Sequence, residues 1–186
     1  MADAYHHGDL RAVVLRQAAD QIAQDGVDRL SLRGLAQRAG VSHAAPAHHF
    51  GDRHGLFTAL ATEGFDLLAA ELQEAGPDLR DVAVAYVRFA LARPGHFAVM
   101  FRSDLLRADD PGLVNARRRS GEALRVGVAS LEGVDDPRSV RLAAWSVVHG
   151  FASLWREGAL AGSELVGASE DPEVVARRIV DRLGFV

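Results

Sequence analysis

Hydrophobic residues recur every three or four positions along almost the whole chain, which is the period of an α-helix and not of a β-strand. The first series of this kind ends at Gly26, a residue suited to the position just after a helix. Ser31 and Ser42 each stand where a helix N-cap is expected, ahead of short helices predicted over 32–39 and 43–50. The pattern therefore predicts an all-α fold.

The helices become longer in the second half of the chain. A fourth helix, which Asp52 can cap, runs up to Gly76 and Pro77, the clearest boundary in the sequence. Further helices are predicted over 78–93, 96–101, 111–131, 137–158 and 172–183. The helices over 78–93 and 137–158 are apolar on two faces, so each should be buried on two sides.

The boundary at Gly76 and Pro77 predicts two domains, which we place at 8–68 and 77–186. The charges divide in a similar way. Residues 1–55 hold six Asp, six Arg and no Glu, so the net charge of −4 arises entirely from the remainder of the chain. The N-terminal part is neutral to cationic and the remainder is acidic.

The composition excludes several classes of protein. The chain has no cysteine, which rules out a disulfide framework, a thiolate zinc site and a cysteine nucleophile. No run of about 18 apolar residues occurs that would span a membrane, and the N-terminal segment lacks the apolar core of a secretory signal. We therefore expect a globular protein of the cytoplasm with no membrane partner.

The most informative segment reads SLRGLAQRAGVSHAAPAHHF and covers residues 31–50. It joins two short helices by a turn of about three to four residues that contains Gly40 and the apolar Val41. This is the layout of a helix-turn-helix, in which the N-terminal end of the second helix enters the major groove of DNA. An ordinary helical hairpin would show the same spacing.

Several motifs in and around this segment resemble the TetR family of transcriptional regulators. They are YHHGDLR at 5–11, LSLR at 30–33, GVSHAAP at 40–46, and His49-Phe50 followed by Asp52-Arg53. Farther on, WSVVHG at 145–150 resembles the signature of the WHG group of TetR C-terminal domains. The resemblance is strong over 8–68. It implies an all-helical homodimer with a DNA-reading head and an effector-binding C-terminal domain.

The resemblance also implies a set of DNA-binding residues in the head. They are Ser31, Arg33, Ser42, His43, Ala44, Ala45, Ala47, His48, His49 and Arg53. Arg33 would read a base edge, since a guanidinium can bond guanine at two atoms, and His49 and Arg53 would contact phosphates. The chain departs from the family at Ala47, where a DNA-contacting Tyr is usual, and at His48, where this group often has Arg.

The histidines near the second helix of this motif also raise the possibility of a metal site. Ligands on one helix face need a spacing of three or four residues, which the adjacent His48 and His49 do not have. Their positions in the family explain them better. We therefore expect no metal, no other cofactor and no catalytic residue.

An effector site is expected among the middle helices of the C-terminal domain, again from the resemblance. The candidate lining residues are Tyr86, Phe89, Phe97, Met100, Phe101, Trp145, His149 and Trp155. They suit an apolar site with few polar groups, and they suit an ordinary core equally well. His149 is the best polar group for a ligand, and a buried neutral histidine bonded to a backbone carbonyl is the alternative.

The family places the helices over 137–158 and 172–183 in a four-helix dimer interface. The candidate interface residues are Val147, Gly150, Phe151, Leu154, Val175, Ile179 and Leu183. The small Gly150 would let two helices approach closely. A core within one chain would use the same residues.

The sequence thus predicts a DNA-binding regulator, most often a repressor in this family, that an unknown small-molecule effector releases from its operator. Its partners would be a pseudo-palindromic DNA duplex, the effector and a second copy of the chain. One alternative is a TetR-like dimer that binds a small molecule and has lost most of its DNA binding, because of Ala47 and His48. Another is an enzyme with His149 as a base, although no catalytic order, metal spacing or phosphate loop supports it.

Overall fold

The computed structural model describes residues 7–129, 131, 134–167 and 169–182, and its regular elements within these ranges are all helices. The prediction of an all-α fold is confirmed. The chain forms two compact units that interleave along the sequence. The first contains the residues up to Phe65 together with Arg93–Asn115, and the second contains Asp66–Ala92 together with the residues from Ala116 onward.

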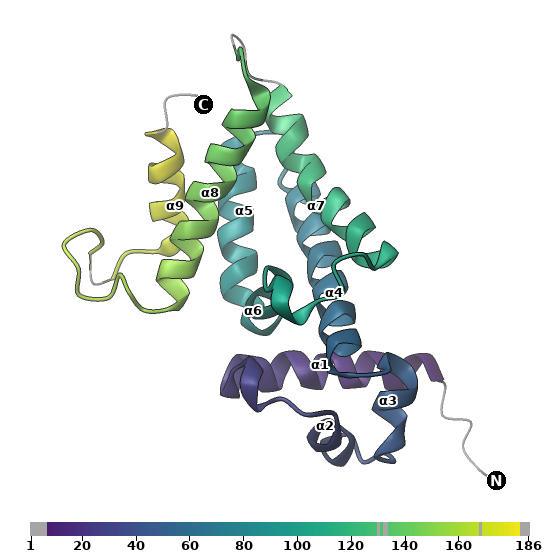
Figure 1. The fold of residues 1–186 in the computed structure, drawn as a ribbon. Helices are drawn as coiled ribbons and strands as arrows, with labels where there is room; N and C mark the ends of the chain where they lie inside the picture. The colour runs from purple at the N-terminus through teal and green to yellow at the C-terminus, as the bar shows by residue number, and fades with distance from the viewer. Residues whose placement is uncertain (1–6, 130, 132–133, 168, 183–186) are drawn as a thin grey trace. The chain divides into compact units, whose positions relative to one another are not determined.

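The helices divide between these units as follows. The first unit contains α1 (His7–Asp25), α2 (Leu32–Arg38), α3 (Ala44–Phe50), α6 (Pro94–Met100) and two short 3-10 turns, η1 (Val27–Arg29) and η2 (Ser103–Leu105). The second unit contains α5 (Leu79–Ala92), α8 (Pro137–Arg156) and α9 (Pro172–Asp181). Two long helices, α4 (Arg53–Glu74) and α7 (Pro111–Ala129), begin in the first unit and end in the second. Figure 1 shows α8 lying alongside α5 and α9.

Helices α1, α2 and α3 pack against one another in the first unit. Leu15 of α1 and Leu35 of α2 are at most 1% exposed, and Phe50 at the end of α3 is 6% exposed. Burying each such side chain contributes about 1.5–3 kcal/mol. Helices as short as α2 and α3 are not stable alone in water, so this burial is what holds them in place.

Helix α6 approaches α1 very closely, and Gly95 makes this possible. A Cβ at residue 95 would lie 2.0 Å from the carbonyl oxygen of Ala19. On α4, Gly64 leaves similar room for Met100, whose Sδ would lie 2.8 Å from a Cβ at residue 64. Because protein interiors are close-packed, any side chain at residue 95 would force the two backbones apart.

Helix α5 is the buried centre of the second unit. Val82, Val84, Tyr86, Val87 and Phe89 cover both of its predicted apolar faces, and each is at most 6% exposed. The prediction that this helix is buried on two sides is confirmed. Helices α8 and α9 both pack against it.

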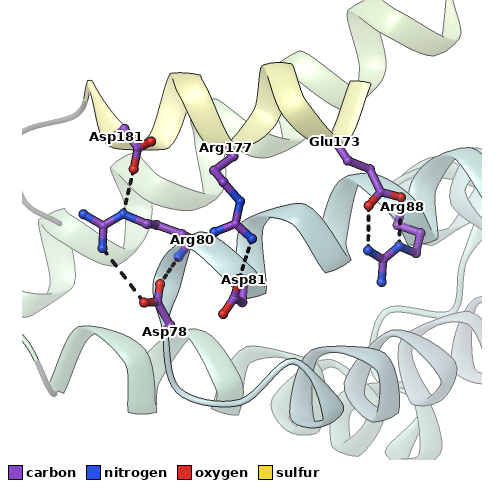
Figure 2. Close-up of polar contacts among 7 residues, drawn as sticks. All are labelled: Asp78, Arg80, Asp81, Arg88, Glu173, Arg177 and Asp181. Carbon is purple, nitrogen blue, oxygen red and sulfur yellow. Dashed lines mark hydrogen bonds and ion pairs between the residues drawn. The ribbon is translucent and has the colours of Figure 1, made fainter. Parts of the chain in front are cut away.

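Ion pairs join α9 to α5 beside their apolar contact (Figure 2). The pairs are Arg80–Asp181, Arg88–Glu173 and Arg177–Asp81, with N–O distances of 2.6, 2.6 and 2.5 Å. Because all six side chains are at least a third exposed, each pair contributes about 1 kcal/mol or less. The buried Val175, Ala176 and Val180 of α9 supply the larger part of the stability of this contact.

Most helix boundaries lie within about two residues of their predicted positions. The cap predicted for Asp52 is confirmed, since Asp52 accepts from the N–H of Gly55. Asp171 also caps α9 by accepting from the N–H of Glu173, which was not predicted. Helix α6 begins at Pro94, two residues earlier than the predicted start at residue 96. Proline suits the first helical position because an N–H there has no partner within the helix.

Two residues of α8 differ in burial from what was expected. Phe151, predicted at a dimer surface, is 7% exposed, whereas Trp145, predicted to line an internal site, is 41% exposed. Leu142 on the same helix is 60% exposed. The period of the pattern shows which residues share a face, and it does not show which of two apolar faces turns inward. None of the described helices is long and apolar enough to cross a membrane.

Candidate functional site

The connection between α2 and α3 is a tight turn closed by backbone hydrogen bonds. The N–H of Val41 donates to the carbonyl of Ala36 at 3.0 Å, and the N–H of Gly40 donates to that of Gln37 at 3.2 Å. This pair of bonds is the Schellman motif, which requires a residue with positive φ. Gly40 has a φ of 66°, so a glycine at this position lets α2 end abruptly and the chain turn into α3.

The cap predicted at Ser42 is wrong. Helix α3 begins at Ala44, one residue later than expected, and its N-cap is His43, whose side chain makes no capping hydrogen bond. The carbonyl of Ser42 accepts from the N–H of Ala45 at 3.0 Å, so the turn runs directly into the helix. Pro46 then falls at the third helical position, where an N–H would have had no intrahelical partner.

One face of α3 is exposed and carries only small or imidazole side chains. The exposed residues at this face are His43, Ala44, Ala47 and His48, and Ala45 and His49 are half-buried. Pro46 and Phe50 point the other way and are buried. The predicted reading residues are thus accessible, and their contact with DNA stays a prediction.

The first turn of α2 places two further predicted contacts at the surface. Arg33 is exposed at the second helical position. Ser31 caps the helix as predicted, because its hydroxyl oxygen accepts from the N–H of Gly34 at 3.1 Å. This cap fixes the start of α2 and with it the backbone of Arg33.

The guanidinium of Arg53 is engaged inside the first unit. Its Nη2 donates to the carbonyl of Val27 at 2.8 Å, and its central carbon lies 5.0 Å from the centroid of the Phe57 ring. Its Nε is buried without a hydrogen-bond partner. A cation over an aromatic face and a charge-assisted hydrogen bond both stabilise this position. Arg53 thus uses part of its guanidinium inside the first unit, and the phosphate contact predicted for it stays a prediction.

The histidines of α3 lie beside one another without forming a chelating group. The ring centroids of His48 and His49 are 5.6 Å apart, edge to face. Among the described residues, no three His, Asp or Glu side chains are placed to hold a metal ion together.

The eight predicted effector residues separate into two groups. Phe97, Met100 and Phe101 belong to the first unit, where the ring of Phe101 packs edge-on against Phe65 and Phe97 at 5.4 Å. The others, which belong to the second unit, are Tyr86, Phe89, Trp145, His149 and Trp155. Three residues assigned to the C-terminal domain thus form part of the core of the first unit, because α6 packs against α1.

A hydrogen bond between α5 and α8 is the clearest polar feature in the second group. The hydroxyl of Tyr86 lies 2.8 Å from Nδ1 of His149. Burial raises the pKa of Tyr86, and a hydrogen bond with Trp145 acts in the opposite direction. Burial lowers the pKa of His149. A neutral imidazole donates at one nitrogen and accepts at the other, so it can bond the neutral phenol in either direction, and the pair is uncharged at neutral pH. No local pattern in the sequence indicated that these two residues meet.

An open groove of about 610 Å³ lies between α5 and α9. Its lining residues are Val84, Arg88, Glu173, Val174, Arg177, Arg178, Asp181 and Arg182, and the predicted effector residues are not among them. Three of the arginines are held by carboxylates, so the groove is not a concentrated cationic site. The hydrogen bonds from Arg178 and from the N–H of Gly167 lower the pKa of Glu170 to about 2.

The predicted dimer residues also differ in burial. Phe151 and Val175 are 7% and 2% exposed, so they serve the core of the single chain and leave little surface for a partner. The other described candidates are Leu154, which is 46% exposed, and Val147, Gly150 and Ile179, which are half-buried; Leu183 lies outside the described residues. A Cβ at Gly150 would have nothing within 4 Å, so the surface of α8 is open there.

Two family models match the chain. The model for bacterial regulatory proteins of the tetR family matches residues 14–60, and the model for the tetracyclin repressor-like C-terminal domain matches residues 79–183. The chain belongs to the TetR family. The finer assignment to the WHG group stays a prediction.

One curated relative is similar over part of its length. The chain is 34% identical over 92 residues to the HTH-type transcriptional repressor Rv1474c of Mycobacterium tuberculosis. The aligned part is 50% of this chain and 46% of that protein, so the chain spans about half the length of this relative.

Solved structures match the TetR-family chain over nearly its whole length. A protein of unknown function from Rhodococcus sp. RHA1 is 36% identical, with 97% of this chain and 96% of that chain covered and a TM-score of 0.77. The TetR-family regulator PfmR from Thermus thermophilus is 24% identical, with 90% and 94% covered and a TM-score of 0.68. The second likeness shows the shared fold.

Proposed function

We propose that this TetR-family chain is a DNA-binding transcriptional regulator that acts as a repressor and is released from its operator by a small-molecule effector. The observation that carries the proposal is the tight α2–turn–α3 connection with an exposed face of small and imidazole side chains on α3. Arg33 adds an exposed guanidinium at the start of α2. The DNA major groove is about 12 Å wide and admits a helix with such a face.

The active form in this proposal is a homodimer on a pseudo-palindromic duplex, with each head on one half-site. The exposed surface of α8 supports a second copy as partner, since Leu142, Trp145 and Leu154 are all at least 41% exposed and the surface at Gly150 is open. The head corresponds to residues 8–68 and the effector and dimer domain to 77–186. Residues 93–115 pack with the head.

The effector would bind in the second unit, near the Tyr86–His149 hydrogen bond. It can release DNA only to the extent that it binds the DNA-free state more tightly than the DNA-bound state. Regulators of this family are generally not enzymes, and the proposal involves no cofactor and no membrane. Such a protein acts in the cytoplasm.

A mobility-shift measurement with a labelled duplex from the region upstream of the gene tests the proposal. We expect a retarded band that survives an excess of unlabelled duplex of scrambled sequence. Binding that the scrambled duplex removes as efficiently as the upstream duplex would contradict sequence-specific regulation.

Ala47 and His48 favour a second candidate function, a small-molecule-binding dimer with weak DNA binding. Both residues are exposed on α3 and lack the aromatic and guanidinium groups usual at these positions. Ala47→Tyr would restore contact area and a hydroxyl donor. Affinity for the upstream duplex should rise if α3 lies in the groove as proposed. Two results together would favour the second function. Wild type would show no specific DNA binding, and Ala47→Tyr would bind every duplex more weakly than wild type does.

A further inference from the structure

The loop between α6 and α7 reaches the start of α4. In this loop, the backbone N–H of Arg107 donates to the hydroxyl oxygen of Thr58 at 2.9 Å. Thr58 is 4% exposed, and its hydroxyl donates in turn to the carbonyl of His54 at 2.7 Å. A buried hydroxyl with both a donor and an acceptor partner is strongly fixed, so the backbone of Arg107 has a defined place against α4.

The side chain of Arg107 covers the α3–α4 corner, which we define as residues 50–53. Its Nη2 lies 3.0 Å from Oδ2 of Asp52. The same nitrogen lies 3.8 Å from the position that a Cβ would take on Gly51, and Nη1 lies 3.3 Å from the corresponding position on Gly55. The side chain of Arg107 is 50% exposed, so the guanidinium sits on this corner and faces solvent.

The charged side chains at the α3–α4 corner are Asp52, Arg53 and Arg107, and they differ in what their groups contact. Arg53 uses its guanidinium inside the first unit, on Val27 and Phe57. Oδ1 of Asp52 accepts from the N–H of Gly55, which leaves Oδ2 to be met by a cation at the corner. Arg107 opposes that carboxylate, and a guanidinium has five N–H donors, so one bond to Asp52 leaves donors available.

We infer that Arg107 is a phosphate contact of the DNA-binding surface, supplied from outside the helix-turn-helix segment. The inference rests on the proposed DNA-binding function. The family resemblance places a phosphate contact at the α3–α4 corner, on Arg53, and Arg107 supplies there the exposed cation that Arg53 does not. A guanidinium suits this role because its planar fork can bond two phosphate oxygens at once.

The salt dependence of DNA affinity tests this inference. Each phosphate contact adds about 0.9 to the slope of log affinity against log salt, so one contact is worth about a 3.5-fold change between 50 and 200 mM salt. Fluorescence anisotropy with the labelled upstream duplex would compare wild type and Arg107→Ala. The loss of affinity of the variant should be about 3.5-fold larger at 50 mM than at 200 mM. Arg107→Lys should keep the wild-type slope, because it retains the charge.

Two further variants separate a direct contact from other effects. Arg102→Ala is the matched control, since Arg102 lies in the same loop, is 50% exposed and bonds Asp104 in the loop itself. Its slope should equal that of wild type. Asp52→Asn/Arg107→Ala removes the carboxylate as well and keeps an oxygen that can cap α4. The double variant should retain the reduced slope of Arg107→Ala.

The outcomes are distinct. A wild-type slope in Arg107→Ala overturns the inference. The inference is also overturned if Asp52→Asn/Arg107→Ala shows the slope and the affinity of wild type, because Arg107 would then only neutralise Asp52. If wild type itself shows no salt-dependent DNA binding, the proposed function fails and the inference fails with it. Thermal unfolding midpoints within the range of wild type would show that the variants fold, since the backbone bond to Thr58 is unaffected by these substitutions.

Discussion

The hydroxyl of Tyr86 on α5 and Nδ1 of His149 on α8 are 2.8 Å apart, and their hydrogen bond joins the buried centre of the second unit to a helix with an exposed apolar surface. Both groups are neutral at neutral pH, because burial raises the pKa of the phenol and lowers that of the imidazole. This bond therefore contributes to stability without a buried charge.

Tyr86→Phe should reduce the free energy of unfolding by about 1–2 kcal/mol. The ring keeps its packing, whereas Nδ1 of His149 loses its hydrogen-bond partner in a half-buried site. Urea unfolding followed by circular dichroism would measure the change, with an unchanged m-value as evidence that the folded state is intact. Ser146→Ala, at an exposed position of the same helix, is the control and should change the free energy of unfolding by less than about 0.5 kcal/mol. Equal stabilities of Tyr86→Phe and wild type would show that the bond contributes nothing net.

His149 should make the stability of the second unit depend on pH below neutrality. Its folded-state pKa lies below the ordinary value of 6.5 because of burial, so the unfolded chain takes up a proton first as the pH falls. The contribution of neutral His149 to the free energy of unfolding is complete above about pH 6.5, and it is lost progressively as the pH drops through the folded-state pKa. The midpoint temperature of thermal unfolding of wild type should therefore decrease as the pH is lowered from about 7.5 to about 5.

His149→Gln should show a smaller fall over the same interval, because glutamine does not titrate and its amide can still bond the hydroxyl of Tyr86 as donor or acceptor. His54→Gln, at an exposed histidine, should behave like wild type. The interval lies above the range in which carboxylates such as Glu63, whose pKa is lowered by its hydrogen bond from His96, begin to take up protons. The same fall in His149→Gln as in wild type would rule out this histidine as the titrating group.

Gly95→Ala should destabilise the first unit by about 1–3 kcal/mol or more. The new methyl group would overlap the backbone at Ala19, and neither backbone can move aside as a flexible side chain would. Gly121→Ala on α7 is the matched control, since a Cβ there meets nothing within 4 Å. Alanine in a helix interior should then stabilise by about 0.5–1 kcal/mol. Chemical unfolding of both variants would show opposite shifts, and a shift of the same sign would contradict the close contact of α6 with α1.

Arg33→Ala should weaken binding to the upstream duplex by about 1–3 kcal/mol and relax the preference at one base position, if Arg33 reads a base edge. Arg38→Ala is the matched control on the same short helix, because Arg38 is exposed and pairs with Asp25 at 3.7 Å. Its affinity should stay close to that of wild type. Binding of Arg33→Ala to a set of single-base operator variants would measure the effect. An equal loss on every duplex would make Arg33 a phosphate contact.

The local features of the fold were the ones that the sequence could predict. The caps at Ser31 and Asp52 and the turn at Gly40 depend on residues no more than five positions apart, so their signals are complete within a short window. The N-cap of α3 is His43 and not the predicted Ser42, for a related reason. Serine favours a cap in general, and here the backbone carbonyl of Ser42 accepts from the N–H of Ala45 while His43 takes the cap position.

The features that bring distant parts of the chain together were not predictable from local patterns. Arg107 and Asp52 are 55 positions apart, and Tyr86 and His149 are 63 positions apart. The contacts of Arg53 could not be predicted either, because its guanidinium bonds the carbonyl of Val27, which lies 26 positions away, and lies over the ring of Phe57. Phe97, Met100 and Phe101 are apolar residues of a predicted middle helix, and only the contact of α6 with α1 shows that they belong to the first unit.

The close contact between Gly95 and Ala19 bears on how this regulator can be recombined with others. A chimera that joins residues 1–76 to a foreign effector domain would keep the helix-turn-helix and lose α6, whose glycine fits directly against α1. The transplanted head would then expose the surface of α1 that α6 covers. A graft that carries residues 93–115 along with the head, as a second inserted segment, would preserve that surface. For this chain, the exchangeable module is discontinuous in sequence.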